Sequence, residues 1–519
     1  MQSLFQISRH CRRVDTVGKH LVMAANNVVT NSKTEPTVGM IIIGDEILKG
    51  QVKDSNSHYL CKRLYRLGVR VKKISVVTDD LDEIANEVKE FSAKYTHVIT
   101  SGGIGPTHDD LTFEGVARAF EEPTYHHPEL VKLCGKFFGT TDLTSPKLKL
   151  ALVPKSAKTN YGINKQTGEQ LIYPLVSVRN VYVFPGVPPL LERAFDSLDE
   201  LFLNPGTIFH TKVVYIAKDE VSITPILNQV NDRFKKDVIL GSYPDFYNSY
   251  YKVKLTLESQ NMEKLSEARQ YIEDHIGKEQ LVDYDPHPLE DASERIYRTI
   301  EGSGTDPLDI KIKSAIRTIE ECIEKYKLSE VCVGFNGGKD CTVLLHLCYA
   351  VIKKKYPEFN DKIQSLYIRR GLPFPELEQF IEKGVKTYNL DSISLLGRIR
   401  DSLGELKTSH PHIKAVLMGT RATDPYSEHL KSFSMTDADW PQFMRVSPIL
   451  DWSYSDVWTF LRRFSLPYCI LYDRGYTSLG SMENTHPNPK LAWRDEKGIT
   501  HYKPAYLLED WHTERDGRN

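Results

Sequence analysis

A glycine turn between a short apolar strand and a helix, VCVGFNGGKDCT at residues 331–342, constrains the fold of this chain most strongly. The residues before the turn are apolar and largely β-branched, whereas the apolar residues over 343–351 recur at helical spacing. A strand that passes through a tight turn into a helix is the repeating unit of a parallel α/β sheet. Gly337 and Gly338 let the backbone approach a ligand closely, and both Lys339 and the helix N-terminus favour an anion. We therefore predict a phosphate-binding turn here.

The size and composition of the chain indicate a multidomain globular protein. Its 519 residues exceed what one hydrophobic core accommodates, so we expect two or three domains. A formal charge of -2 gives no reason to expect nucleic acid as a partner, and no apolar stretch approaches the ~20 residues that span a membrane. The eight cysteines include no C-x-x-C pair, which argues against structural zinc and for a reducing compartment.

Residues 1–36 differ from the rest of the chain. They carry several arginines and hydroxyl residues, and Asp15 is the one acid before Glu35. This composition is typical of a mitochondrial presequence, and a disordered basic tail is the alternative. We expect a cytoplasmic protein, with a mitochondrial form if residues 1–35 act as a presequence.

Over residues 37–205 strand and helix patterns alternate, which predicts a parallel sheet with helices on its faces. Two strand-ending loops, GDEILKGQVKDSN and SGGIGPTHDDLT, are rich in glycine and acids, and ligands bind at such carboxyl ends. We expect a phosphate site made of Asp45, Glu46, Gly102, Gly103 and Gly105. Asp109 and Asp110 would hold a divalent metal through oxygen ligands. The alternative for this pair is a helix N-cap and a first-turn acid.

Three segments in this order, GDEILKGQVKDSNSHYL, TSGGIGPTHDDLT and VFPGVPPLLE, carry a resemblance. Residues 38–205 resemble the molybdopterin-binding fold that molybdenum-cofactor biosynthesis proteins share with CinA-type pyrophosphatases. The chain has PKSAKTNYGINKQTGEQ where cofactor-binding relatives carry an Asn- and Gly-rich segment, so molybdopterin binding is not expected. The resemblance implies hydrolysis of a dinucleotide pyrophosphate, as in FAD, and an inactive or regulatory module is the alternative.

The remaining chain divides into three parts. Residues 206–285 read as a small α+β subdomain, and 286–306 as a linker because EGSGTDP interrupts two amphipathic helices. Residues 307–519 return to alternating strands and helices, which predicts a second parallel-sheet α/β domain.

A second group of polar residues follows a strand of the carboxy-terminal domain. Gly419, Arg421 and Asp424 lie in KAVLMGTRATDP, just past a strand end where the ligand of the phosphate turn is expected. The planar arginine fork suits a phosphate. The alternative is an Arg421–Asp424 pair that closes the loop.

The segments FNGGKD, GTRATDP, PILDWSYSDVW, LYDRGYTSLG and PNP occur in that order. The carboxy-terminal domain resembles the PAPS-reductase-like FMN adenylyltransferases, members of the adenine-nucleotide α-hydrolase group. Joined to the first domain, it resembles the two-domain FAD synthases of animals. This implies transfer of AMP from ATP to FMN, giving FAD and pyrophosphate. A PAPS reductase-like enzyme is the alternative, but such reductases carry a carboxy-terminal nucleophilic cysteine and no cysteine follows Cys469.

The resemblance also implies roles for individual residues. The ATP site would contain Phe335, Asn336, Gly337, Gly338, Lys339, Gly419 and Arg421. The catalytic residues would be Asn336, Lys339, Asp340 and Arg421. The FMN site would contain Asp424, Trp440, Arg474, Gly475, Tyr476, Arg515 and Arg518. Mg²⁺ would bridge the ATP phosphates, FAD could be retained as product, and client flavoproteins fit as partners; the sequence gives no oligomeric state.

Overall fold

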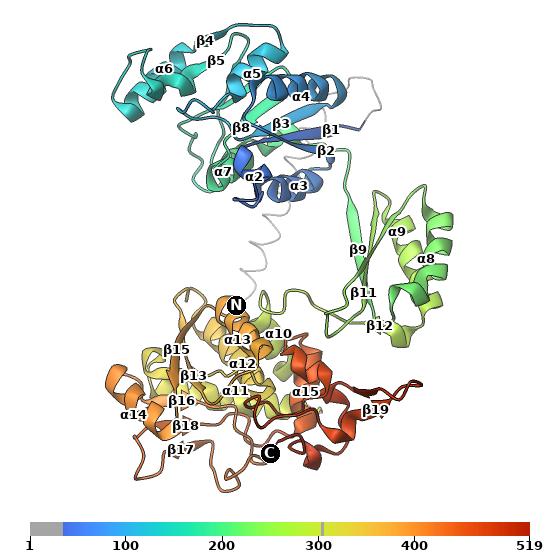
Figure 1. Ribbon diagram of the computed structural model, residues 1–519, viewed down its shortest axis with the longest axis vertical. Coiled ribbons are helices and arrows are strands. Elements are labelled where there is room, and N and C mark those ends of the chain that lie inside the picture. Colours follow the sequence, from blue (N-terminus) through green and yellow to red (C-terminus); the bar gives the residue numbers. More distant parts are fainter. Residues whose placement is uncertain (1–34, 303–305, 519) are drawn as a thin grey trace, which may run out of the picture. The chain divides into compact units, whose positions relative to one another are not determined.

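The computed structural model describes residues 35–302 and 306–518 (Figure 1). The predicted leader lies outside the described residues except for its last two. The chain divides into two compact units. The first contains the chain as far as Lys212 together with 228–241 and 256–272, and the second contains 213–227, 242–255 and the chain from Glu273 onward.

The first unit is built on a six-stranded sheet of order β2-β1-β3-β8-β7-β6. Its strands are β1 (Thr37–Ile43), β2 (Arg70–Val77), β3 (His97–Ser101), β6 (Lys158–Asn160), β7 (Leu175–Val178) and β8 (Val181–Phe184). The first four in the order run parallel, and β7 and β6 are antiparallel to their neighbours. A separate pair is formed by β4 (Thr124–His126) and β5 (Leu152–Pro154).

Helices cover both faces of this sheet (Figure 1). They are α2 (Asp45–Leu48), α3 (Asn56–Arg66), α4 (Leu81–Lys94), α5 (Thr112–Ala119), α6 (Pro128–Phe138) and α7 (Pro188–Leu198). Because side chains alternate along a strand, Met40 of β1 packs in the cluster with α3 and α7, and Ile41 in the cluster with α4 and α5. The predicted α/β domain with a parallel sheet is confirmed.

The middle segment is a small α+β arrangement. Its elements are β9 (His210–Ile216), α8 (Glu220–Phe234), β10 (Ile239–Pro244), β11 (Val253–Ser259), α9 (Met262–Ile276) and β12 (Leu281–Val282). The four strands form a sheet of order β10-β11-β9-β12. The alternating burial of β11 is typical of a strand with one covered face.

The second unit has a six-stranded sheet of order β15-β14-β13-β16-β18-β17. Its strands are β13 (Val331–Gly334), β14 (Ile363–Arg369), β15 (Leu390–Leu396), β16 (Ala415–Leu417), β17 (Phe433–Met435) and β18 (Met444–Val446). All pairs are parallel except β17 with β18. From β13, the first strand of this sheet in sequence, the next two strands β14 and β15 are added on one side, and the later strands β16 and β18 are added on the other. The carboxyl end of β13 is therefore a topological switch point, where ligands bind in such sheets.

The helices of the second unit are α10 (Ala292–Glu301), α11 (Pro307–Lys325), α12 (Lys339–Lys355), α13 (Pro375–Thr387), α14 (Ile399–Ser409) and α15 (Tyr454–Arg463). A small antiparallel pair, β19 (Ala492–Arg494) and β20 (Thr500–Tyr502), follows. Helix α12 is buried around most of its circumference, between the sheet and α10, α11 and α15. The segment 286–306 contains α10, whose Ile296 is buried in the same core. None of the helices in the described ranges combines the length and apolarity needed to cross a membrane.

The histidine in the buried helix α12 makes stability depend on pH. His346 is enclosed by Tyr388, Phe460 and Phe464, and its Nδ1 lies 3.2 Å from the Tyr388 hydroxyl. Burial, reinforced by Arg295, lowers the pKa of His346 to about 3. Because the unfolded histidine binds a proton below pH ~6.5 and the folded one does not, stability falls as pH drops below that value.

We expect the free energy of unfolding to fall by about 1.4 kcal/mol per pH unit between pH 6 and 5 through this group. His346→Asn should remove that part of the slope, whereas His412→Asn, at an exposed loop position, should retain it. Urea unfolding followed by tryptophan fluorescence at several pH values measures the slopes. Equal slopes in both variants would contradict the assignment.

Candidate active site

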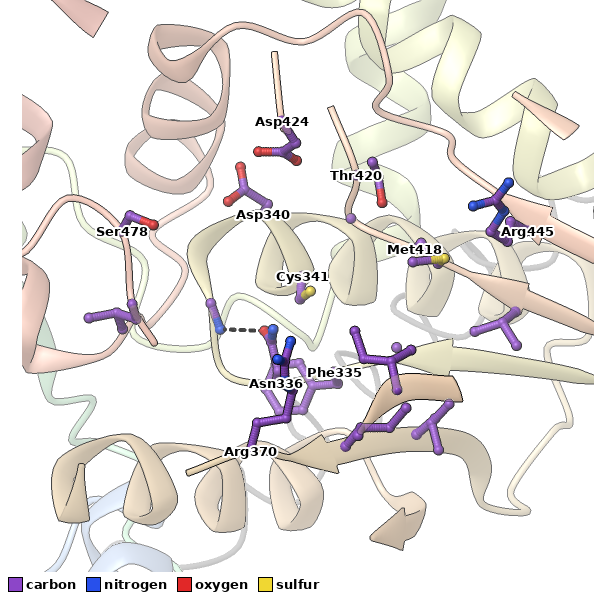
Figure 2. A pocket seen from close by; sticks show the side chains of 18 of the residues that line it. Phe335, Asn336, Asp340, Cys341, Arg370, Met418, Thr420, Asp424, Arg445 and Ser478 are labelled. Carbon is purple, nitrogen blue, oxygen red and sulfur yellow. Dashed lines mark hydrogen bonds between the residues drawn. The ribbon is translucent and has the colours of Figure 1, made fainter. Parts of the chain in front are cut away.

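The predicted phosphate turn connects β13 to α12, and its backbone is held by two side chains. The Asn336 Oδ1 accepts a hydrogen bond from the Gly338 N–H at 3.0 Å, drawn in Figure 2. The Lys339 N–H donates to the Tyr472 hydroxyl at 2.9 Å. Gly337 has a φ of 72°, and a Cβ there would lie 2.7 Å from a leucine of α13. Glycine is therefore required at that position both for conformation and for space.

A second glycine brings the end of β16 against the first turn of α12. A Cβ on Gly419 would lie 2.9 Å from the Asp340 carbonyl carbon and from the Cys341 nitrogen, both backbone atoms. This close approach places Thr420 and Asp424 beside the turn, and Figure 2 shows the Asp424 and Asp340 side chains near one another. Two loops that are distant in sequence thus meet at the switch point.

A cavity of about 600 Å³ opens at this place, within the size range of small-molecule sites. The predicted site residues that line it are Phe335, Asn336, Gly338, Lys339, Asp340, Gly419, Asp424, Trp440, Arg515 and Arg518. Its apolar wall comes from β14, α14, β16 and the segment before β18: Leu366, Ile368, Ile399, Leu403, Val416, Met418 and Phe443. Arg370, Thr420, Arg445 and Ser478 add polar groups that were not predicted.

Three residues expected at an FMN site are not among those lining the cavity. Arg474 is largely exposed and forms an ion pair of 2.6 Å with Glu376. Gly475 ends a short 3₁₀ turn with a φ of 86°, and the Tyr476 ring packs edge-on against Phe374. In this structure these residues hold the 470–476 loop to α13.

The two cations predicted to bind phosphate are turned toward carboxylates. The Lys339 Nζ lies 2.6 Å from the Glu514 Oε1 and 2.9 Å from the Asp340 Oδ2. The Arg421 Nη2 lies 2.7 Å from both Glu514 oxygens, and its Nε lies 2.8 Å from the Asp340 Oδ1 without hydrogen-bond geometry. Both cationic side chains are only 2% exposed. The alternative expected from the sequence, a contact between Arg421 and Asp424 that closes the loop, is also present, because the Asp424 carboxylate accepts a hydrogen bond from the Arg421 backbone N–H at 2.9 Å.

The two buried cations keep the neighbouring Asp340 ionised. Burial acts to raise the pKa of Asp340, but the adjacent Lys339 and Arg421 outweigh it and hold that pKa below its usual value. Burial raises the pKa of the Tyr472 hydroxyl well above its ordinary value, so it stays protonated while it accepts the Lys339 N–H. Asp340 is therefore a carboxylate at neutral pH.

Sequence reasoning missed Glu514, the residue that joins the two cations. It lies 175 residues from Lys339 and 93 from Arg421, inside a tail with charges of both signs. Nothing in its local pattern separates it from a solvated acid. The one available signal was charge balance, since Asp340 is the one acid of the two loops that contacts both buried cations, and Asp424 lies 3.8 Å from the Arg421 Nη2.

In the first unit, the predicted acidic residues Asp45, Glu46 and Asp109 lie near a further acid, Asp79. The Asp45 N–H donates to Asp79 Oδ2 at 3.0 Å. Burial raises the pKa of Asp79, and the negative charges of Glu46, Asp45 and Asp109 add to this effect, against the hydrogen bond from Asp45. Asp79 was not predicted, because it follows β2, whose end carries no glycine motif.

The glycine loop of the first unit is shaped as its sequence requires, and its two aspartates differ. Gly102 and Gly103 have φ values of 107° and 59°. Asp110 accepts the Thr107 N–H at 2.9 Å inside the loop, whereas Asp109 is exposed. Among the described residues, no group of three or more His, Cys, Asp or Glu side chains is arranged to hold a metal ion.

Comparison with protein families divides the chain into three consecutive regions. Residues 39–203 match the probable molybdopterin binding domain, 208–285 match the middle domain of FAD synthase, and 330–407 and 403–487 match the phosphoadenosine phosphosulfate reductase domain. The chain is 39% identical to a probable FAD synthase of Caenorhabditis briggsae, over 93% of this chain and 96% of that one. It belongs to the FAD synthase family. A second probable FAD synthase, from Caenorhabditis elegans, is also 39% identical, over 93% of this chain and 97% of its own length.

Two solved structures are similar to parts of this FAD synthase-family chain. Candida glabrata FMN adenylyltransferase in complex with FMN and the ATP analogue AMPCPP is 29% identical, covers 44% of this chain and 99% of its own, and has a TM-score of 0.40. A CinA protein from Thermoplasma acidophilum is 30% identical, covers 33% of this chain and 99% of its own, and has a TM-score of 0.29.

The close approach at Gly419 can be tested by adding a methyl group. Gly419→Ala should lower the free energy of unfolding by about 1–3 kcal/mol, because the Cβ would meet backbone atoms of α12 that cannot rotate away. Gly404→Ala is the matched control, since its Cβ would meet nothing closer than 3.9 Å. That change lies inside helix α14 and should stabilise by about 0.5–1 kcal/mol. Urea unfolding followed by tryptophan fluorescence measures both, and a loss of equal size in the two variants would contradict the packing argument.

Proposed function

We propose that this FAD synthase-family chain transfers the AMP group of ATP to FMN, forming FAD and releasing pyrophosphate, through its carboxy-terminal unit. One observation carries the proposal: a single cavity joins a phosphate turn at the switch point to an apolar wall suited to a flat ring. Both nematode relatives are named as probable FAD synthases, which agrees with this activity. Reduction of PAPS is not favoured.

The reaction makes small demands on proton transfer. The FMN phosphate is already an anion and attacks the α-phosphorus of ATP without a strong base. The rate then comes from in-line positioning and from stabilising charge on the leaving pyrophosphate. We assign the α-phosphate to the Asn336 side chain. The Asn336 Oδ1 is used inside the turn, which leaves its Nδ2 to donate to a phosphate oxygen.

The cations that face the cavity are arginines outside the turn. Arg370 is exposed and lies close to Asn336 in Figure 2. Arg515 is exposed and approaches Asp424 at 3.0 Å, and the Arg518 guanidinium donates to the Leu479 carbonyl at 2.7 Å. We assign Arg515 and Arg518 to the substrate phosphates, and Trp440 in the apolar wall to the flavin ring.

Mg²⁺ would enter with ATP. The carboxylates nearest to the turn, Asp340 and Asp424, each have both oxygens directed to nitrogens of Lys339, Arg421 or Arg515. They fit a dedicated metal cage poorly, whereas Mg²⁺ commonly keeps several waters and binds through substrate phosphates. The ion would supply charge neutralisation to the pyrophosphate.

We propose a second activity for the first unit, metal-dependent hydrolysis of FAD to FMN and AMP. It is supported by the acidic surroundings of Asp79, whose pKa is raised by burial and further by the negative charges of Glu46, Asp45 and Asp109. Because no group of three such side chains among the described residues is arranged to hold a metal ion, the ion would enter with the pyrophosphate of FAD. A regulatory module without hydrolysis is the alternative. We place the protein in the cytoplasm, with a mitochondrial form if residues 1–35 act as a presequence, and with client flavoproteins as recipients of FAD.

The first function is tested by mixing purified protein with FMN, ATP and Mg²⁺ and measuring FAD and pyrophosphate. We expect the two products in equal amounts. Pyrophosphate release without FAD, or reduction of PAPS with thioredoxin, would contradict the proposal. FAD incubated with divalent metal alone, followed for FMN and AMP, tests the second activity.

Asn336→Ala should reduce kcat/KM for FAD formation by about 100-fold, the usual cost of one donor to a developing oxyanion. Asn360→Ala, at an exposed position after α12, is the matched control and should behave as the parent. Steady-state kinetics with both substrates varied measures the effect. A change below about threefold in Asn336→Ala would remove this residue from the α-phosphate site.

A further inference from the structure

A carboxylate of the chain itself sits where two buried cations would bind an oxyanion. Glu514 presents both oxygens to the Arg421 Nη2 at 2.7 Å, and one of them to the Lys339 Nζ at 2.6 Å. Glu514 and Lys339 both line the cavity, at the end that holds the phosphate turn. A lysine and an arginine fork that converge on one point are groups that bind phosphate oxygens well.

The carboxylate is fixed rather than loosely placed. The Glu514 side chain is 11% exposed, and its backbone carbonyl accepts a hydrogen bond from the Thr477 hydroxyl at 2.6 Å. The preceding carbonyl, of Thr513, accepts from the Asn488 side chain at 2.7 Å. These contacts hold the backbone on both sides of Glu514 and so fix the place of its carboxylate between the two cations.

The charges around this point balance. Lys339, Arg421 and Arg515 contribute three positive charges, and the carboxylates paired with them are Asp340, Asp424 and Glu514. The Arg518 guanidinium also faces the cavity. Without Glu514, the two nearly buried cations would share Asp340, with Asp424 at 3.8 Å from the Arg421 Nη2, and an incompletely compensated buried charge is strongly unfavourable. An anion from solution would then gain by entering.

We propose that Glu514 is a positioning residue that acts as a built-in counter-anion: it occupies the oxyanion-binding point between Lys339 and Arg421 and so limits how tightly the site retains pyrophosphate. The inference rests on the proposed function for its biological meaning, because pyrophosphate is the product that must leave. The occupancy itself is a property of the folded chain.

The test measures binding of inorganic pyrophosphate to the full-length chain by calorimetry, without nucleotide or divalent metal. Glu514→Gln should bind pyrophosphate about tenfold more tightly than the parent, since it frees two cations. Glu514→Asp withdraws the carboxylate by one methylene and should lie between them. Glu509→Gln removes an exposed acid from the same segment and should match the parent. In FAD synthesis, Glu514→Gln should show stronger inhibition by added pyrophosphate at saturating substrate, an effect that mere loss of folded protein would not produce.

A double variant keeps the inference testable if Glu514→Gln folds poorly. Arg421→Gln combined with Glu514→Gln removes one cation with the anion, and should return pyrophosphate affinity to within about threefold of the parent if the effects are coupled. Unchanged or weaker pyrophosphate binding in folded Glu514→Gln and Glu514→Asp would overturn the inference. If the parent instead makes no FAD, the proposed function fails, whereas the calorimetric result for Glu514 still stands.

Discussion

The burial of α12 is the constraint on which the second unit depends. This helix is enclosed by the sheet and by three other helices, so its first turn has one position available. Lys339 is carried into the interior at that turn, and a buried ammonium needs carboxylates within reach. Asp340 comes from the same turn and Glu514 from far along the chain. The requirement to neutralise buried charge therefore shapes the site as much as any ligand does.

The same requirement separates two kinds of cation. Lys339 and Arg421 are nearly buried and paired with carboxylates, although Lys339 also lines the cavity. Arg370, Arg515 and Arg518 are more exposed and line the cavity as well. The two groups differ in side-chain freedom. A nearly buried arginine has a fixed orientation and can hold two loops together, whereas a partly exposed arginine can change its conformation when a substrate binds. The motif residues thus serve the architecture of the turn, and residues outside the motif supply its outward charge.

Local patterns in the sequence predicted much of this arrangement. Over residues 331–351, the apolar β-branched residues predict the strand, the glycines predict the turn, and the helical spacing of apolar residues predicts the helix. The structure has β13, the turn and α12 at these places. What the sequence did not predict depends on long-range folding. The pairing of Lys339 with Glu514, the contact of Asp79 with Asp45 and the outward position of Arg370 follow from which segments meet in the fold. Motif order alone does not specify the direction of side chains such as Arg474.

The return of the carboxy-terminal segment to the phosphate turn has a consequence for biosynthesis. Residues 514–518 are translated after every other part of the cavity, yet they supply its counter-anion and two of its arginines. A nascent chain that has been translated only as far as β20 lacks Glu514, the carboxylate that pairs with both Lys339 and Arg421. Premature stop codons at or before residue 514 should therefore act as loss-of-function alleles.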